Sequence, residues 1–469
     1  MASLPKPAPT HTVPAHPGTV SRPDLRWFTP IAGVYVVLWS FWLHRGWVGV
    51  LLPDSAEYME ASHWAPWDKR LWTELRPPVY PMLIKLVGND EARGVWLQIV
   101  LVALLWLLAA WLLREALDST PARVAVVVVV LAFSLTEPLV AFTLTVLTES
   151  LSAALAAVLT ALVMRAWRAP NRRSVGIAVA VGWLWVALRY TNAYELVYAG
   201  GLLCFAALLI LWRGDDAARV KRAAATAGVG VVTAAAILLT YPSMSSGYWT
   251  GPFHDITIFR VLPDPEMKAF FVDHGLPQVD RLEQYRNLPL FSYNQQDINR
   301  DPTMKPYVDW VYSDGRATYA QWIGRHPAWA VTSPFDDLGE TVGDHRLGAF
   351  ALGKLDHVPD GMLGRVLFPG STYVLVPGLV LVGAALWALR RRLDRRHGAL
   401  AACCAIGIAQ IWFSWLGDPN EIARHALSAS THARVAWLVL LVVCVERVLQ
   451  LRAQGHGPAS PTTDVSSSS

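Results

Sequence analysis

Two carboxylates and a tyrosine follow directly on the end of an apolar segment near the start of the chain. In the stretch LLPDSAEYME, the apolar residues end at Pro53, and Asp54, Glu57 and Tyr58 come next. A carboxylate placed against a substrate can accept a proton from an attacking hydroxyl, so Asp54 and Glu57 are candidate catalytic residues. Tyr58 is a candidate for positioning an acceptor or a lipid. The same spacing also fits a helix capping box, in which Asp54 accepts from first-turn amides and Glu57 reaches back.

Ionisable residues recur at the edges of other apolar segments. Glu149 opens one in LTESL, Arg189 closes another in LRYTNAY, and GDPNEIARH supplies Glu421, Arg424 and His425. Arginine holds phosphate through paired, planar hydrogen bonds, so Arg189 and Arg424 are candidate phosphate ligands, with His425 as a third donor. Glu149 is a third candidate catalytic acid, and Glu421 is a candidate for acceptor or lipid positioning.

Structural explanations compete with each of these assignments. Glu149 also suits a helix N-terminus electrostatically. Arg189 also suits the lipid headgroup region, where long basic side chains extend out of the bilayer. Arg424 and His425 also fit ordinary loop residues. The shared location of these residues is therefore the stronger signal, and it depends on the elements that position them.

The composition indicates a membrane protein. The 469 residues are 54% hydrophobic and only 16% charged, whereas soluble domains carry about 25% charged residues. Mean hydropathy is +0.33, and apolar runs of the length needed to cross a bilayer recur along the chain. All four cysteines lie in such runs, which favours small buried residues over disulfides or zinc ligands. The net charge is only +4, and the basic residues are spread over short loops rather than gathered on one face, so no nucleic-acid partner is predicted.

We predict an all-α polytopic protein with about ten transmembrane helices. The predicted spans lie near 27–44, 94–113, 122–142, 147–164, 174–190, 193–212, 223–241, 366–389, 399–417 and 431–449. Lys and Arg are concentrated in every second short connection, which places both termini in the cytoplasm. The predicted organisation is a disordered tail (1–26), seven spans (27–241), a large external loop (242–365), three spans (366–450) and a second disordered tail (451–469).

This orientation brings the candidate residues to one face of the membrane. Two long segments, 46–93 and 242–365, are predicted to lie outside, and the first of them contains Asp54, Glu57 and Tyr58. Ionisable residues at membrane depth are costly and usually face a cavity or a partner. We therefore expect a polar cavity that opens outward beneath the two external segments.

The order of several motifs resembles the GT-C superfamily of glycosyltransferases, which use polyprenyl-phosphate sugars. These motifs are PDSAEY, RPPVYPMLIKLVG, ARGVWLQIVLVALL, LTESL, LRYTNAY and the final E..RH pattern. They are most similar to the branch that includes protein O-mannosyltransferases and lipid A aminoarabinose transferases. The likeness covers about residues 27–215 and 400–450, while the large external loop matches in position but not in sequence.

The resemblance implies roles for individual residues. The family's first-loop acid, its proposed base or acceptor-orienting carboxylate, falls on Asp54. The family's adjacent second acid is replaced by serine here, and the next acid is Glu57. Glu149 matches the acid that begins the fourth span. Arg424 lies where a basic residue is expected near the lipid phosphate, with His425 in place of a tyrosine.

We therefore expect a hexosyl- or pentosyltransferase that moves a sugar from a polyprenyl-phosphate donor to a glycan, lipid or protein acceptor at the outer face of the cell membrane. The departing phosphate gains negative charge, which arginines can stabilise. An envelope polysaccharide polymerase or ligase and a polytopic lipid or solute transporter stay open as alternatives. A transporter is expected to carry ionisable residues near mid-span. No cofactor or metal ligand set is assigned, and participation of a divalent cation is left open.

Overall fold

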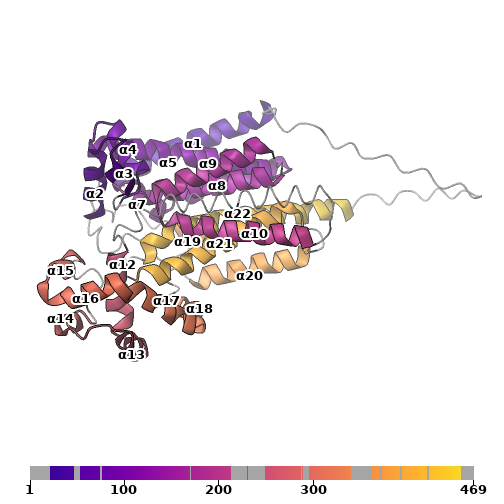
Figure 1. The fold of residues 1–469 in the computed structure, drawn as a ribbon. Coiled ribbons are helices and arrows are strands. Elements are labelled where there is room, and N and C mark those ends of the chain that lie inside the picture. The colour runs from indigo at the N-terminus through magenta and orange to yellow at the C-terminus, as the bar shows by residue number, and fades with distance from the viewer. Residues whose placement is uncertain are drawn as a thin grey trace, which may run out of the picture.

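The computed structural model shows a chain built of helices (Figure 1). It describes residues 22–46, 53–73, 76–168, 171–212, 230, 249–286, 288, 295–337, 339, 362–368, 372–390, 393–419 and 422–455. These ranges contain no strand, so the all-α prediction is confirmed for them. The predicted span 223–241, apart from residue 230, and the candidate Glu421 lie outside the described residues.

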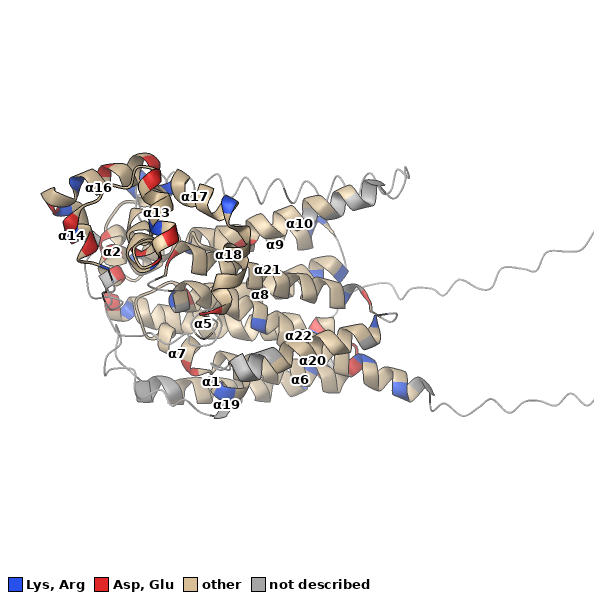
Figure 2. Cartoon of the chain, turned by 90° about the horizontal axis from the view of Figure 1, so that it is seen from below, with Lys and Arg blue, Asp and Glu red and all other residues tan. Residues whose placement is uncertain are grey.

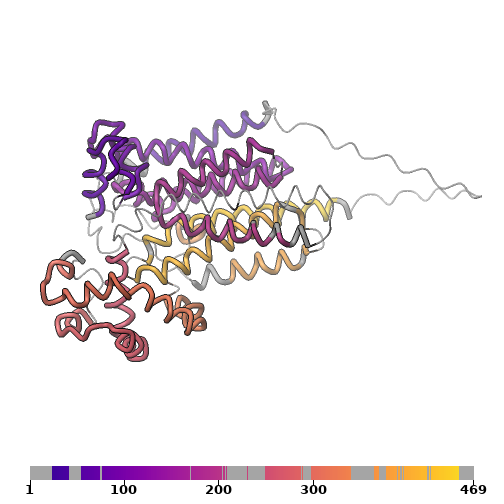
Figure 3. The backbone as a smooth tube through the Cα atoms, in the orientation of Figure 1, coloured from indigo at the N-terminus to yellow at the C-terminus, as the bar shows by residue number. Residues whose placement is uncertain are grey.

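Long helices run side by side as a bundle (Figures 1 and 3). They are α1 (Arg22–Gly46), α5 (Glu91–Leu113), α6 (Thr120–Ser134), α8 (Glu149–Arg168), α9 (Arg172–Leu188), α10 (Asn192–Trp212), α20 (Thr372–Leu389), α21 (Arg395–Gly417) and α22 (Ile422–Gly455). Each of these helices overlaps one predicted span. Among the described residues, Glu91–Ala116, Glu149–Arg168 and Arg396–Gly417 are long and apolar enough to cross a membrane, and a bent pair gives up to a fourth span. The number of ten spans therefore stays a prediction.

The predicted span 122–142 is broken into the bent pair. α6 ends at Ser134, and α7 (Glu137–Thr143) continues at an angle of 58°. Pro138 lies in the first turn of α7, and its missing N–H and its ring prevent one continuous helix. The buried amide of Gln98 on α5 donates to the carbonyls of Thr143 (3.0 Å) and Thr145 (2.9 Å), which satisfies backbone groups where α7 ends.

Small residues allow close packing around α8, which packs against α5, α9 and α22. Its buried residues include Ala153, Ala154, Ala156, Ala157 and Ala161. Small side chains let helices in a bilayer approach closely and gain van der Waals contact.

Gly407 of α21 likewise allows a close approach, at the contact with α22. A Cβ at this position would lie 2.8 Å from the backbone oxygen of Ala429 and 2.8 Å from the backbone nitrogen of Ala433. The spacing of α21 and α22 therefore depends on a glycine here.

Two groups of short helices gather at one end of the bundle (Figure 1). The first predicted external segment forms α2 (Pro53–Ser62), α3 (Lys69–Thr73) and α4 (Val79–Leu86). The second forms α12 (Thr250–Ile256), η2 (Thr257–Val261), α13 (Pro265–Asp273), α14 (Asp280–Glu283), α15 (Gln295–Arg300), η3 (Pro302–Met304), α16 (Lys305–Trp310), η4 (Val311–Gly315), α17 (Arg316–Arg325), α18 (Pro327–Thr332) and η5 (Ser333–Phe335). A 3₁₀ turn, η1 (Arg114–Ala116), follows α5, and α19 (Met362–Leu367) precedes α20.

The second group has its own hydrophobic core, which includes Phe271, Tyr307 and Trp322. We call it the external helical unit (residues 249–286 and 295–337), after the external loop that the sequence predicts. It lies within the segment 242–365 that the sequence predicts as a large external loop, and within it α17 ends at Arg325, before Pro327 begins α18.

Charged residues gather toward the two ends of the bundle (Figure 2). The described chain begins and ends at the end opposite α2–α4 (Figure 1). Ion pairs tie helices together at that opposite end, where Arg114 lies 3.0 Å from Asp24 and Arg396 lies 2.9 Å from Asp118. The prediction that both termini are cytoplasmic requires them to lie at the same end, as these helix ends do.

Candidate functional site

Asp54 lies in the first turn of α2 between two arginines. Its Oδ1 is 2.7 Å from Nη2 of Arg76, and its Oδ2 accepts a hydrogen bond from Nη2 of Arg424. Burial acts to raise the pKa of Asp54, but Arg424 and Arg76 outweigh it and hold the pKa well below its usual range. The carboxylate is therefore ionised at neutral pH, as a proton acceptor must be.

The segment around Asp54 is fixed to the bundle by its neighbour. The buried hydroxyl of Ser55 donates to the carbonyl oxygen of Val146 at 3.0 Å, in the short connection between α7 and α8. This bond ties the start of α2 to the segment that leads into Glu149. Ser55 thus holds the start of α2 in place beside Asp54.

Arg424 connects Asp54 to a second, more deeply buried carboxylate. Its Nε lies 2.9 Å from Oε1 of Glu149, and the same oxygen lies 2.7 Å from Nη1 of Arg189. The side chain of Glu149 is 2% exposed and that of Arg189 is 7% exposed. Removing one partner of such a buried pair leaves an uncompensated charge, so each residue depends on the others to stay in place.

His425 extends this cluster toward the end of α21. Its Nδ1 lies 3.1 Å from Nη2 of Arg189, and its Nε2 lies 3.2 Å from Oδ2 of Asp418, the residue that follows α21. A guanidinium has no acceptor, so Nδ1 must accept from Arg189 and Nε2–H must donate to Asp418. These two contacts fit the neutral form of the imidazole.

Arg76 connects Glu57 and Tyr58 to the same cluster. Its Nε lies 2.6 Å from Oε2 of Glu57, and its guanidinium carbon lies 5.0 Å from the centroid of the Tyr58 ring. Tyr58 packs edge-to-face on Tyr80, with ring centroids 5.1 Å apart. Burial raises the pKa of Tyr58, so its hydroxyl stays protonated at neutral pH. Arg76 therefore faces two carboxylates and one aromatic ring.

A narrow cleft opens among these groups, with space of about 20 Å³, room for about one water molecule. It is lined by Tyr58, Arg76, Pro77, Thr148, Glu149, Arg189, Tyr190, Thr191, Arg424 and His425. Three guanidinium groups and the carboxylates that pair with them thus converge where α2, α8, α9 and α22 meet. We call Asp54, Glu57, Arg76, Glu149, Arg189, Asp418, Arg424 and His425 the charged cluster.

The structure brings together most of the residues that the sequence singled out. Asp54, Glu57, Tyr58, Glu149, Arg189, Arg424 and His425 all contact the charged cluster, while Glu421 lies outside the described residues. Asp54 and Glu57 both contact arginines, which the capping-box explanation alone does not account for.

Sequence reasoning missed two members of the cluster. Arg76 lies in the quoted motif RPPVYP, in the same predicted external segment as Asp54 and Glu57, but four other basic residues of that segment gave the sequence no means to single it out. Asp418 stands in the quoted GDPNEIARH segment beside the candidates that were chosen.

The cluster does not have the composition of a cation site. Within the described part of the chain, no group of three or more His, Cys, Asp or Glu side chains is placed to hold a metal ion. Asp54 and Glu149 face guanidinium groups, which would compete with a cation for the same oxygens. We therefore derive no step through a divalent cation.

Comparison with known proteins found no matching family model and no matching curated protein. Among solved structures, the chain is similar to the archaeal oligosaccharyltransferase AglB from Archaeoglobus fulgidus, solved in complex with an inhibitory peptide and a dolichol-phosphate. The two are 13% identical with a TM-score of 0.48, and the match covers 94% of this chain and 53% of that chain. The chain thus spans about half the length of that relative. A likeness at this level does not assign a function to the residues of the site.

Proposed function

We propose that the chain is a membrane glycosyltransferase that moves a sugar from a polyprenyl-phosphate donor to an acceptor hydroxyl at the outer face of the membrane. One observation carries the proposal: Arg424 contacts both Asp54 and Glu149, so a carboxylate suited to accept a proton adjoins guanidinium groups suited to bind phosphate. This pairing is what transfer from a sugar phosphate requires.

The chemistry assigns a role to each group. Asp54 accepts the proton of the acceptor hydroxyl as that oxygen attacks the anomeric carbon. The bond from this carbon to the phosphate oxygen breaks, and the phosphate leaves with the electron pair. Arg424 and Arg189 hold the negative charge that develops on the leaving oxygen. His425 orients Arg189, because its Nδ1 accepts from that guanidinium while its Nε2–H donates to Asp418. A single direct displacement of this kind inverts the anomeric centre.

The ion pairs indicate how donor binding would activate the base. Arg424 contacts Asp54 directly, and its positive charge lowers the pKa of that carboxylate. A phosphate that takes over Arg424 would weaken this contact. The pKa of Asp54 would then rise, and its carboxylate would become a stronger base when the donor is in place.

One observation favours the alternative of a transporter. Inside the bundle, Nδ1 of His432 on α22 lies 2.5 Å from Oε2 of Glu195 on α10, and both side chains are buried. Protonatable pairs at membrane depth occur in transport pathways. The experiment must therefore separate the two functions.

The test is sugar transfer by the purified protein in lipid vesicles. Radiolabelled polyprenyl-phosphate sugars are supplied as a panel, with a membrane extract as the source of acceptors. The proposal predicts that label moves from at least one donor to an acceptor in a single linkage. Movement of intact donor between leaflets without loss of the sugar would instead support transport, and release of polymer would support a polymerase or ligase.

A further inference from the structure

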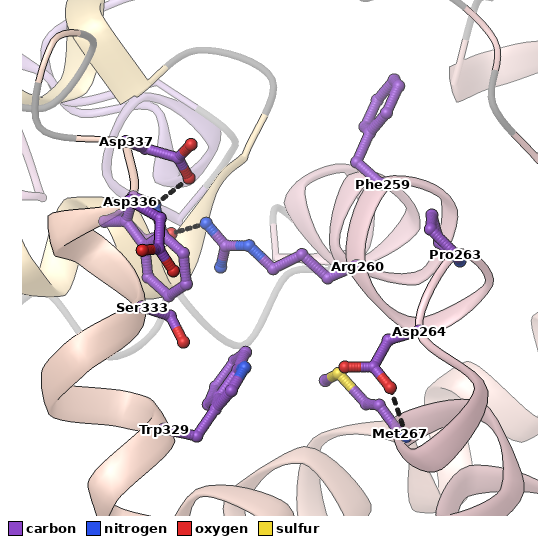
Figure 4. Close-up of a pocket in the computed structure, with 10 residues that line it drawn as sticks. Phe259, Arg260, Pro263, Asp264, Met267, Trp329, Ser333, Asp336 and Asp337 are labelled. Carbon is purple, nitrogen blue, oxygen red and sulfur yellow. Dashed lines mark hydrogen bonds between the residues drawn. The ribbon is translucent and has the colours of Figure 1, made fainter.

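A second cavity of about 360 Å³ lies where the external helical unit meets the end of α21 (Figure 4). Its volume is within the range of small-molecule sites, about 300–1,000 Å³. Phe259 and Arg260 from η2 contribute to one wall, Trp329, Ser333 and the two aspartates after η5 to another, and Trp415 from α21 completes it.

We propose that this cavity binds the acceptor and that the acceptor is a neutral glycan. This inference rests on the proposed function, which leaves open whether the acceptor is a glycan, a lipid or a protein.

The walls of the cavity are held by contacts within the protein. The guanidinium of Arg260 stacks on the Trp415 ring with its carbon 3.7 Å from the ring centroid, and it donates to the carbonyl of Leu416 at 3.1 Å. Nε1–H of Trp415 donates to Oδ2 of Asp337 at 2.8 Å, and the hydroxyl of Tyr319 also donates to Leu416 at 2.8 Å. A site whose walls are already ordered loses less entropy when a ligand binds.

The lining offers the groups that recognise sugars. Sugar hydroxyls are donors that carboxylates accept well, and the exposed Asp336 lies beside Asp337 in the cavity wall (Figure 4). The half-buried ring of Trp329, whose centroid is 5.7 Å from that of Trp415, offers an apolar face for the C–H groups of a pyranose or furanose ring. Ser333 adds a hydroxyl that can both donate and accept.

The position of the cavity suits an acceptor site. Arg260 binds the carbonyls of Trp415 and Leu416, and two residues further on Asp418 contacts His425 in the charged cluster. The last turn of α21 is thus shared between the cavity and the proposed transfer site. A glycan chain seated in the cavity would lie beside the cluster that receives its terminal hydroxyl.

Binding is tested without any donor, on the full chain in lipid nanodiscs. Saturation-transfer NMR is recorded with four neutral disaccharides: maltose, cellobiose, α-1,6-mannobiose and α-1,5-arabinobiose. We expect at least one to bind, with affinity independent of salt and reduced about tenfold or more by Asp336→Asn. A second variant, Trp329→Ala, removes the ring face, and Asp309→Asn and Trp67→Ala serve as controls because both residues are exposed outside the cavity.

Each outcome decides the assignment. Loss of binding in both cavity variants but in neither control supports it. Binding by none of the four disaccharides overturns it, as does equal binding by all variants. Binding of a lysine-rich peptide in place of the saccharides, weakened by salt, would assign the cavity to a cationic ligand. If saccharides bind but no donor yields transfer, the proposed function fails and the cavity still binds a glycan. If transfer occurs but no saccharide binds, the proposed function stands and the cavity assignment fails.

Discussion

Arg424, in the first turn of α22, donates a hydrogen bond to Asp54, in the first turn of α2, across 370 residues of sequence. The same guanidinium lies 2.9 Å from Glu149 at the start of α8. One side chain therefore connects the proposed base to the most deeply buried acid of the cluster. Changes that alter this guanidinium, or that shift α22, should affect catalysis more than they affect folding.

Replacing Arg424 with lysine tests whether the planar guanidinium is required. A lysine keeps the charge, but a single ammonium cannot present two nitrogens in the same fixed geometry to Asp54 and a phosphate. We expect kcat/KM for the donor to fall by about a hundredfold, the equivalent of about one hydrogen bond to a charged group. The control is Arg447→Lys, further along α22 and bonded to Gln450. Equal activity of the two variants would exclude a direct role for Arg424.

The pH dependence of transfer tests the electrostatics around Asp54. Arg76 is one of the two cations that lower the pKa of this carboxylate, so Arg76→Gln should raise that pKa toward its usual value. Protonated Asp54 cannot accept a proton. When the solution is acidified, the variant should therefore lose activity at a higher pH than the wild type does. Arg70→Gln is the matched control, because Arg70 pairs with Asp68 in the same predicted external segment. If Arg76→Gln loses activity at the same acidic pH as the wild type, the assignment of Asp54 as the base is contradicted.

The contact of α21 with α22 should control the geometry of the cluster. Gly407→Ala places a Cβ within 2.9 Å of backbone and side-chain atoms of α22, so the two helices must separate or slide. Asp418 follows one helix and Arg424 and His425 begin the other, so we expect transfer to fall at least tenfold while the protein stays folded. Gly398→Ala, at a position on α21 with nothing within 4 Å, should keep wild-type activity. Equal activity of both variants would show that the site does not depend on this contact.

His254 should make the external helical unit sensitive to acid. Burial lowers the pKa of this histidine to about 4, and its ring nitrogens lie 3.0 Å from the Tyr307 hydroxyl and 3.1 Å from Oδ1 of Asn299. The unfolded chain takes up a proton below about pH 6.5, whereas the folded one resists it down to about pH 4. Stability is therefore fully present above pH 6.5 and falls by up to about 3 kcal/mol as the pH drops to 4.

The measurement is thermal unfolding of the full chain at pH 7 and pH 5, followed by tryptophan fluorescence. From pH 7 to pH 5, the melting temperature of His254→Gln should fall less than that of the wild type. His63→Gln, at an exposed position, should behave like the wild type. An equal pH-dependent drop in His254→Gln would mean that other groups set the acid sensitivity.

The sequence predicted where the helices and the site lie better than it predicted which side chains of the site contact one another. Hydropathy and flanking charges placed Glu149, Arg189 and Arg424 at one face, because all three stand at ends of apolar segments. The pairing of Arg424 with Asp54 could not be predicted, since it depends on how α2 folds back over the bundle. The bend at Pro138 interrupts a run that is apolar throughout, and the core of the external helical unit is built from contacts between residues distant in sequence.

The central claim is that Asp54 is the base, and the most direct test compares Asp54→Asn with Glu57→Gln in single-turnover transfer from a bound donor. Both variants remove one negative charge next to Arg76, but only Asp54 also contacts Arg424. The account predicts that Asp54→Asn binds donor and transfers its sugar at least about a hundredfold more slowly, as loss of a general base should. It predicts that Glu57→Gln loses less than about tenfold. Transfer by Asp54→Asn at the wild-type rate would contradict the account.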